Sequence, residues 1–294
     1  MGDPGARGPL HGYRLTTLAV NVPGPAAAAR LAELGAEVVK VEPPNGDPLQ
    51  AACPEWYEEL ASGQRIERLD LKDETDAAKL EEILAGSDML LTSSRPSALA
   101  RLGLSPEKVQ ARHPRLAYVE IVGYPPPREE DPGHDLTYLA ELGMLAKDMP
   151  RSLLADLSGA QEAVSAALAL LLDRERGAEA RHARVSLSEA AQRLAAPLRH
   201  GITAPGGPLG GGDPLYGIYE TREGRIALAA LEPHFRKRLL EELGMEKESR
   251  ETLRGIFAER SAADWEEWAA ERDLPLIALK EDPWEHQRNE KEQR

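Results

Sequence analysis

The stretch Tyr13–Pro44 reads YRLTTLAVNVPGPAAAARLAELGAEVVKVEPP and predicts a β-α-β unit. An apolar run rich in β-forming residues over 13–20 predicts a buried strand. Residues 26–34 are strong helix formers, and Gly35 ends the helix. A second strand over 36–42 is stopped by two prolines. Such a unit predicts a parallel sheet with a right-handed crossover.

Strands and helices continue to alternate beyond this unit. Further strands are predicted over 65–71, 88–92 and 116–122, with helices between them. This alternation is typical of an α/β fold with a doubly wound parallel sheet. Ligands of such sheets bind beyond the carboxyl ends of the strands, where residues 93–95 and 123 onward are expected.

The turn after the first strand does not carry a dinucleotide-binding fingerprint. Residues 21–25 read NVPGP rather than G-x-G-x-x-G. Glu42 ends the second strand, where dinucleotide-binding folds place a ribose-binding acid, but this position indicates little without the glycines. We therefore expect a Rossmann-like scaffold that does not bind NAD.

Glycine and proline dominate residues 201–213, which predicts a linker or mobile loop. We expect a large Rossmann-like domain over 1–200 and a smaller α+β domain over 214–294. The large domain would end with a helix over 159–172 and a strand over 183–187. The smaller domain is expected to hold a hairpin (216–220 and 225–231) and helices over 233–243, 249–259 and 262–272.

Composition excludes several classes of function. The 294-residue chain has a formal net charge of −14, which argues against a nucleic-acid partner. Cys53 is the only cysteine, so an intrachain disulfide is impossible and a reducing cytoplasm is the expected location. No apolar run approaches the roughly 20 residues of a membrane span, so no membrane partner is expected. None of the seven histidines has metal-ligand spacing, and we expect no metal.

Three side chains suggest proton chemistry, each with an ordinary structural alternative. His134 follows Gly133, which permits close backbone approach to a ligand, but Asp135 could equally cap a helix beside an uninvolved histidine. Asp156 precedes a long apolar helix, and an N-cap explains it at least as well as catalysis does. Glu232, before Pro233, could be an N-cap or an acid directed into a cleft.

Four sequence blocks occur in a fixed order along the chain. They are PGPA (23–26) through LGAEVVKVEPP (34–44) to GDP (46–48); LDLK (69–72) with RP (95–96) and RLGL (101–104); GHDLTYLA (133–140) with Asp156; and YGIYET (216–221) with ALEPHF (230–235). In this order the blocks resemble the family III CoA-transferases, which include the α-methylacyl-CoA racemases. The GHD and ALEP forms are more similar to the racemase branch.

The resemblance implies an enzyme that binds CoA thioesters and forms an interlocked homodimer, with each active site between one chain's large domain and the other's small domain. Asp156 matches an aspartate that is the nucleophile in transferases and a base in racemases. His134 would be the second base, and Glu232 would support it from the partner chain. No prosthetic group is implied; coenzyme A enters as part of the substrate. CoA contacts carry over to Leu69, Asp70, Leu71, Lys72, Ser93, Ser94, Arg95, Arg101, Gly133, Asp135, Leu136, Thr137 and Tyr138.

These assignments are consistent with proton transfer at the acidified α-carbon of a 2-methylacyl-CoA, between His134 and Asp156. The N–H groups of residues 156–159 are candidate donors to the enolate oxygen. Acyl selection is expected from the insert 144–152 and the loop 206–212.

Two alternatives stay open. A family III CoA-transferase would use Asp156 as a nucleophile and form an aspartyl-CoA thioester. A non-catalytic acyl-CoA-binding protein is suggested by Ser62-Gly63-Gln64-Arg65, where the family has a more basic segment, and by a chain that ends sooner than most members.

Overall fold

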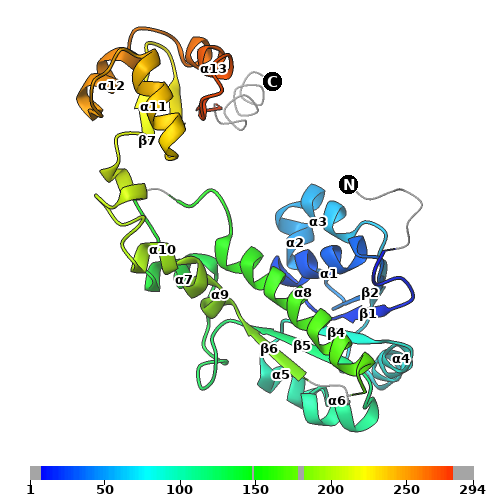
Figure 1. The fold of residues 1–294 in the computed structure, drawn as a ribbon. Helices are drawn as coiled ribbons and strands as arrows, with labels where there is room; N and C mark the ends of the chain where they lie inside the picture. Colours follow the sequence, from blue (N-terminus) through cyan, green and yellow to red (C-terminus); the bar gives the residue numbers. More distant parts are fainter. Residues whose placement is uncertain (1–7, 148, 178–181, 281–294) are drawn as a thin grey trace, which may run out of the picture. The chain divides into compact units, whose positions relative to one another are not determined.

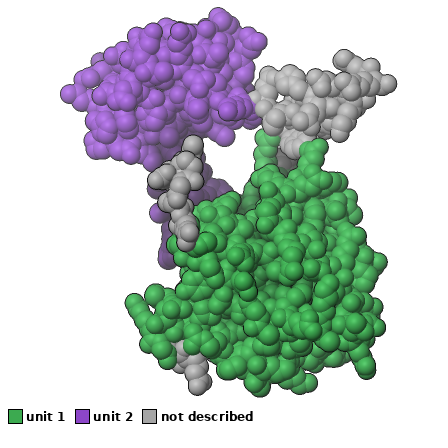
Figure 2. Space-filling view, turned by 90° about the vertical axis from the view of Figure 1, so that its right-hand side faces the viewer, with its two compact units in different colours: residues 1–195 green, residues 196–294 purple. Residues whose placement is uncertain are grey.

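The computed structural model describes residues 8–147, 149–177 and 182–280, and it divides into two compact units, residues 1–195 and 196–294 (Figure 2). Each unit contains a sheet of its own, of six strands in the first and three in the second. The large domain was predicted to end at residue 200, and the segment 201–213 lies within the second unit.

The first unit is built on a parallel six-stranded sheet in the order β3-β2-β1-β4-β5-β6 (Figure 1). The strands are β1 (Arg14–Thr17), β2 (Glu37–Glu42), β3 (Arg65–Arg68), β4 (Met89–Thr92), β5 (Ala117–Val122) and β6 (His182–Ser186). From β1 the chain adds β2 and β3 on one side and then β4, β5 and β6 on the other, so the strand order reverses between β1 and β4. In such sheets the ligand-binding crevice lies at this point, beyond the carboxyl ends of the strands. The predicted α/β fold with a parallel sheet is confirmed.

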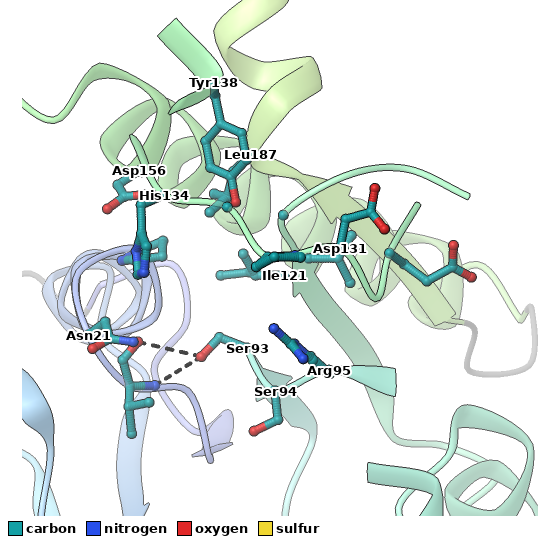
Figure 3. Close-up of a pocket in the computed structure, with 17 residues that line it drawn as sticks. Asn21, Ser93, Ser94, Arg95, Ile121, Asp131, His134, Tyr138, Asp156 and Leu187 are labelled. Carbon is teal, nitrogen blue, oxygen red and sulfur yellow. Dashed lines mark hydrogen bonds between the residues drawn. The ribbon is translucent and has the colours of Figure 1, made fainter. Parts of the chain in front are cut away.

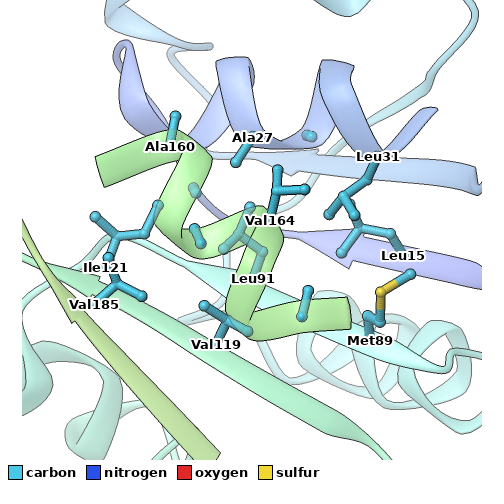
Figure 4. Close-up of a cluster of buried hydrophobic side chains, with 14 of the residues drawn as sticks. Leu15, Ala27, Leu31, Met89, Leu91, Val119, Ile121, Ala160, Val164 and Val185 are labelled. Atoms are coloured by element: carbon cyan, nitrogen blue, oxygen red, sulfur yellow. The ribbon is translucent and has the colours of Figure 1, made fainter. Parts of the chain in front are cut away.

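Helices cover both faces of this sheet. One face packs against α1 (Pro23–Glu33), α8 (Leu154–Glu175) and α9 (Leu187–Leu194); the other packs against α4 (Glu74–Ala85), α5 (Pro96–Arg101) and α6 (Pro106–Arg112). In Figure 4, α1 and α8 lie side by side over the strands, with Ala27 and Ala160 where the two helices meet. Because alanine side chains are small, the two helices approach closely and both contact the sheet.

Helix α8 differs from its prediction at the position that bears on function. It begins at Leu154 rather than at Gly159, and its N-cap is Leu153. Asp156 is therefore inside the first turn, and the N-cap interpretation of Asp156 is wrong. The short helices α2 (Pro48–Ala52) and α3 (Pro54–Ala61) were not predicted, whereas α7 (Asp135–Glu141) follows His134 as expected.

The second unit contains the antiparallel strands β7 (Tyr216–Glu220), β8 (Arg225–Ala229) and β9 (Leu276–Ala278). Its helices are α10 (Ala196–Arg199), α11 (Pro233–Glu242), α12 (Arg250–Phe257) and α13 (Ala262–Ala270), with a single π-type turn, η1 (Pro208–Gly212). The hairpin and three helices agree with the prediction, and β9 was missed because three residues after a proline give too little pattern.

The glycine-rich segment is folded closely on itself. A Cβ at Gly210 would lie 1.8 Å from the carbonyl oxygen of Ala204, so glycine is required there. Arg250 donates hydrogen bonds to the carbonyl oxygens of Gly211 (3.0 Å) and Asp213 (2.6 Å). These bonds tie the segment to the start of α12.

A buried ionic cluster lies at the carboxyl end of β2. Lys40, only 1% exposed, places Nζ 2.9 Å from Glu42 Oε1 and 2.6 Å from Asp47 Oδ2. Tyr57 donates its hydroxyl to Glu42 Oε1 (2.6 Å), and burial, followed by this hydrogen bond, raises the pKa of the Tyr57 hydroxyl. Asp47 Oδ1 accepts the N–H of Asn21 (3.0 Å), so the cluster reaches the loop after β1.

Replacing Lys40 by Met should lower the free energy of unfolding by about 3 kcal/mol, because the buried carboxylates of Glu42 and Asp47 lose their cation. Urea denaturation of both proteins measures the difference. The matched control is Lys79→Met, which breaks the half-exposed Lys79–Glu67 pair (2.7 Å) and should cost less than about 1 kcal/mol. Equal losses in the two variants would contradict a special role for the buried cluster.

Candidate active site

A cavity of about 280 Å³ lies at the carboxyl ends of β1, β4 and β5 (Figure 3). Figure 3 shows His134 and Asp156 together on one side of the cavity, with Ser94 and Arg95 on another. It is lined by Val20, Asn21, Pro23, Ser93, Ser94, Arg95, Ile121, Val122, Gly123, Glu129, Asp131, Pro132, Gly133, His134, Tyr138, Asp156 and Leu187. The two bases predicted from the sequence thus line one cavity.

His134 is held at the N-terminus of α7 by backbone capping. Thr137 Oγ1 accepts the N–H of His134 (3.0 Å) and donates to its carbonyl oxygen (2.8 Å). The exposed side chain of His134 reaches the cavity. Thr137, expected as a CoA contact, lies outside the cavity lining and positions His134 instead.

Asp135 lies inside the first turn of α7 and does not cap that helix, whereas the role of His134 stays a prediction. Asp135 is 4% exposed, and its Oδ1 accepts the N–H groups of Ala155 (2.6 Å) and Asp156 (3.0 Å). This carboxylate joins α7 to the start of α8. Asp135 was expected among the CoA contacts, but it does not line the cavity.

Gly133 is required by a contact inside the protein. A Cβ at Gly133 would lie 2.5 Å from Tyr138 Cε1, and one at Gly123 would lie 2.5 Å from Tyr138 Oη. Two glycines therefore make room for one tyrosine ring, which is 1% exposed and forms part of the cavity wall.

Asp156 has the electrostatics of a base that works near neutrality. Burial and, after it, the negative charge of Asp135 together raise the pKa of its carboxyl from 3.8 to about 6, against the opposite effect of His134. A carboxyl with this pKa is mostly ionised at pH 7 and still takes up a proton readily, as general acid–base catalysis needs.

The amides expected to hold an enolate oxygen are already engaged. The N–H of Asp156 is bonded to Asp135, and the N–H of Leu157 donates to the carbonyl of Leu153 (3.0 Å). Ser158 and Gly159 lie inside α8, where N–H groups bond to the preceding turn. The prediction that residues 156–159 supply oxyanion donors is therefore wrong.

A second cavity, of about 230 Å³, adjoins the first and shares Val20 and Ser94 with it. Its walls are largely aliphatic, from Leu18, Val41, Leu69, Leu71, Leu99, Leu102 and Leu104. Asp70 and the exposed Lys72 lie at its edge. The segment Leu69–Lys72, predicted to contact CoA, thus lines this second cavity, and Ser93, Arg95, Gly133 and Tyr138 line the first.

Three other predicted residues lie outside both cavities. Arg101 is exposed at the end of α5, and Leu136 is 39% exposed on α7. Glu232 is exposed in the second unit, at the N-cap of α11, where its side chain makes no capping hydrogen bond. Its support of His134 from a partner chain stays a prediction.

Sequence reasoning missed several lining residues. Asn21 follows β1 with a left-handed backbone (φ 67°), and Glu129 and Asp131 come from the loop before His134. The rule that ligands bind at the carboxyl ends of strands could have found Asn21, because it lies just beyond the first predicted strand. The same rule did not find Leu187, because the sequence predicted it as the last residue of a strand over 183–187. In the structure β6 ends at Ser186, and Leu187 lies just beyond it.

In the described part of the chain, no group of three or more His, Cys, Asp and Glu side chains is arranged to hold a metal ion. The helices described there include none with the length and hydropathy needed to cross a membrane.

The chain is similar to known proteins over most of its length. The model of CoA-transferase family III matches residues 10–282. The human α-methylacyl-CoA racemase is 31% identical over 288 residues, which cover 87% of this chain and 74% of the relative. The succinate–glutarate CoA-transferase of Agrobacterium fabrum is 27% identical, covering 77% of this chain and 64% of the relative. A hypothetical protein from Mycobacterium tuberculosis has the same fold, with a TM-score of 0.82 and 24% identity over 96% of this chain and 87% of that one.

Proposed function

The chain belongs to CoA-transferase family III, and on that premise we propose that it is an isomerase similar to α-methylacyl-CoA racemase. The observation that carries the proposal is that an imidazole and a carboxylate with a pKa of about 6, His134 and Asp156, line the same cavity. Proton transfer at an α-carbon needs such a pair, one group to remove the proton and one to return it.

The proposed reaction starts with a 2-methylacyl-CoA whose thioester acidifies the α-carbon. In one direction the Asp156 carboxylate takes the α-proton, and protonated His134 delivers another to the opposite face of the enolate. In the other direction neutral His134 removes the proton and protonated Asp156 returns it. Each cycle leaves both groups ready for the reverse direction, and no redox change is needed.

The two adjoining cavities match the two ends of a CoA thioester. The aliphatic cavity around Leu69 and Leu71 suits a flat, largely apolar base, and the cavity with His134 suits the thioester. Lys72 and Arg95 line these cavities and offer positive charge to phosphate groups in a protein whose net charge is −14. We assign the nucleotide end of CoA to the second cavity on this basis.

The homodimer and a cytoplasmic location belong to the same proposal. In it, Glu232 of one chain meets His134 of the other, and its exposed carboxylate is free of capping bonds for this purpose. A molar mass near twice 32.1 kDa by light scattering would support this part. A monomer that is fully active would exclude it.

The test is α-proton exchange. The protein, incubated with a single C2 epimer of a 2-methylacyl-CoA in D₂O, should incorporate one deuterium at the α-carbon and yield both epimers, as measured by NMR and chromatography. No exchange between pH 5 and pH 9, with CoA binding intact, would exclude the isomerase.

The second candidate is a CoA-transferase, favoured by the cavity-facing carboxylate of Asp156 and by the similarity to a succinate–glutarate CoA-transferase. There Asp156 attacks the thioester carbonyl, CoA thiolate leaves to give a mixed anhydride, and the thiolate then attacks the aspartyl carbonyl, releasing the carboxylic acid and leaving an aspartyl-CoA thioester. Hydroxylamine would trap that thioester as a hydroxamate on Asp156. Binding of CoA with neither exchange nor hydroxamate would point to a non-catalytic acyl-CoA-binding protein.

A further inference from the structure

The carboxylate of Asp135 is an unusual cap for helix α8. The first N–H groups of a helix have no acceptor within the helix, and the residue just before the helix ordinarily supplies one. In α8 that residue is Leu153, whose side chain has no acceptor. Asp135, 20 residues before Ala155 in sequence, takes this place and binds the N–H groups of Ala155 (2.6 Å) and Asp156 (3.0 Å).

This capping joins the two proposed bases through very few atoms. Asp135 directly follows His134, and its Oδ1 binds the backbone N–H of Asp156 itself. Besides the packing of α7 against α8, this carboxylate is thus a direct link between the segments that carry the two bases.

We propose that Asp135 is a positioning residue that fixes Asp156 relative to His134 and keeps a negative charge beside Asp156. The inference rests on the proposed function and deepens it, because the family's reaction needs both bases at set positions. The Asp135 side chain lines neither cavity and would act through Asp156.

Aspartate and asparagine could make the same hydrogen bonds at position 135, but only aspartate carries a negative charge. Asn would offer the same amide-bonded oxygen, whereas Asp also carries a buried Oδ2 with no hydrogen-bond partner. A buried, unpaired carboxylate oxygen is costly, so its presence calls for a compensating role. After burial itself, the charge of Asp135 is the largest cause that raises the pKa of Asp156.

The surroundings of Asp156 add little other charge at close range. His134 acts on it in the opposite direction from Asp135, and Tyr138 is uncharged at neutral pH, as tyrosines ordinarily are, with burial raising the pKa of its hydroxyl still more. The neighbouring elements α1, α9 and β5 bring uncharged Pro23, Leu187 and Ile121 to the cavity. The remaining charged groups in the lining are Arg95, Glu129 and Asp131.

The test separates the two contributions with Asp135→Asn and Asp135→Ala, and its first readouts do not need activity. Amide exchange at Ala155 and Asp156, followed by NMR, should quicken about tenfold in D135A and stay protected in D135N, because only D135A lacks the acceptor. The carboxyl carbon of Asp156 should titrate near pH 6 in the wild type and at a lower pH in D135N.

The second readout is the pH profile of α-proton exchange. In D135N its acid limb should move to lower pH with the rate at pH 8 nearly kept, and in D135A the rate should fall about 100-fold at every pH. The matched control is Ser261, which caps α13 through the N–H of Asp264 (3.2 Å) and lines neither cavity. Ser261→Ala should lower thermal stability and leave the profile unchanged.

Two outcomes would overturn the proposal: unchanged amide protection at Ala155 and Asp156 in folded D135A, or an Asp156 titration that is the same in D135N and the wild type. Because neither readout needs turnover, they remain decisive if the wild type shows no α-proton exchange. In that case the proposed isomerase would fail while the positioning role of Asp135 could still stand.

Discussion

Asp156→Asn should abolish α-proton exchange, lowering its rate by about 10³-fold or more. Asn has nearly the shape of Asp and leaves the bond from its own N–H to Asp135 in place, so the loss reports the missing base. The measurement is deuterium incorporation into a single C2 epimer of the substrate. The control is Asp173→Asn, an exposed aspartate near the end of the same helix, which should retain full activity.

The same variant should be more stable than the wild type. The pKa of Asp156 is raised from 3.8 to about 6 in the fold, so the stability linked to this group is complete below pH 3.8 and is lost as pH rises through about 6. Asn never ionises and does not suffer this loss. With a discount for partial solvent screening, D156N should gain about 2 kcal/mol at pH 7.5 and nothing at pH 3.5.

Urea denaturation at these two values of pH provides the measurement. If D156N is inactive but no more stable than the wild type at pH 7.5, then ionising Asp156 does not lower the stability of the fold. An active D156N would exclude Asp156 as either base or nucleophile, and with it both proposed enzymes.

His134→Ala separates the two enzymatic proposals. An isomerase should lose about 10³-fold in exchange, because one face of the enolate has no proton donor or acceptor. A transferase should still form the hydroxylamine-sensitive adduct on Asp156. Because His134 is exposed and lines an open cavity, added imidazole should restore part of the exchange rate in the variant.

The control for His134 is His113→Ala. His113 lies after α6, bonded to Glu81 (2.9 Å), and does not line either cavity. It should retain full exchange activity. Unchanged exchange in His134→Ala would remove the imidazole from the reaction and leave the isomerase without its second base.

The parallel sheet could be predicted because its signals are local: apolar runs, helix formers and Gly or Pro stops follow each other within a few residues. The helix 74–85 agrees with α4 for this reason, since Asp73 caps it and Gly86 follows it. The start of α8 could not be predicted in the same way. Its cap comes from Asp135, 20 residues earlier, and a pattern within one window contains no sign of a partner so distant.

The site shows the same limit. His134 and Asp156 were candidates from the sequence itself, and the resemblance then made Gly133 and residues 135–138 expected contacts of CoA. The structure divides them by function: Thr137 and Asp135 hold backbone atoms, while His134 and Tyr138 line the cavity. Adjacent positions on a helix point in different directions, so adjacency in sequence does not imply a shared role.

The ionic cluster of β2 has a consequence for engineering the substrate specificity of the proposed enzyme. Asn21 lines the cavity, but its left-handed backbone is held by Asp47, which is itself bound by Lys40. A mutagenesis library restricted to lining positions would vary Asn21 while keeping its anchor fixed. Libraries that vary Asn21 together with Asp47 would reach loop conformations that single substitutions cannot, and the first selection in such a library should be for folding.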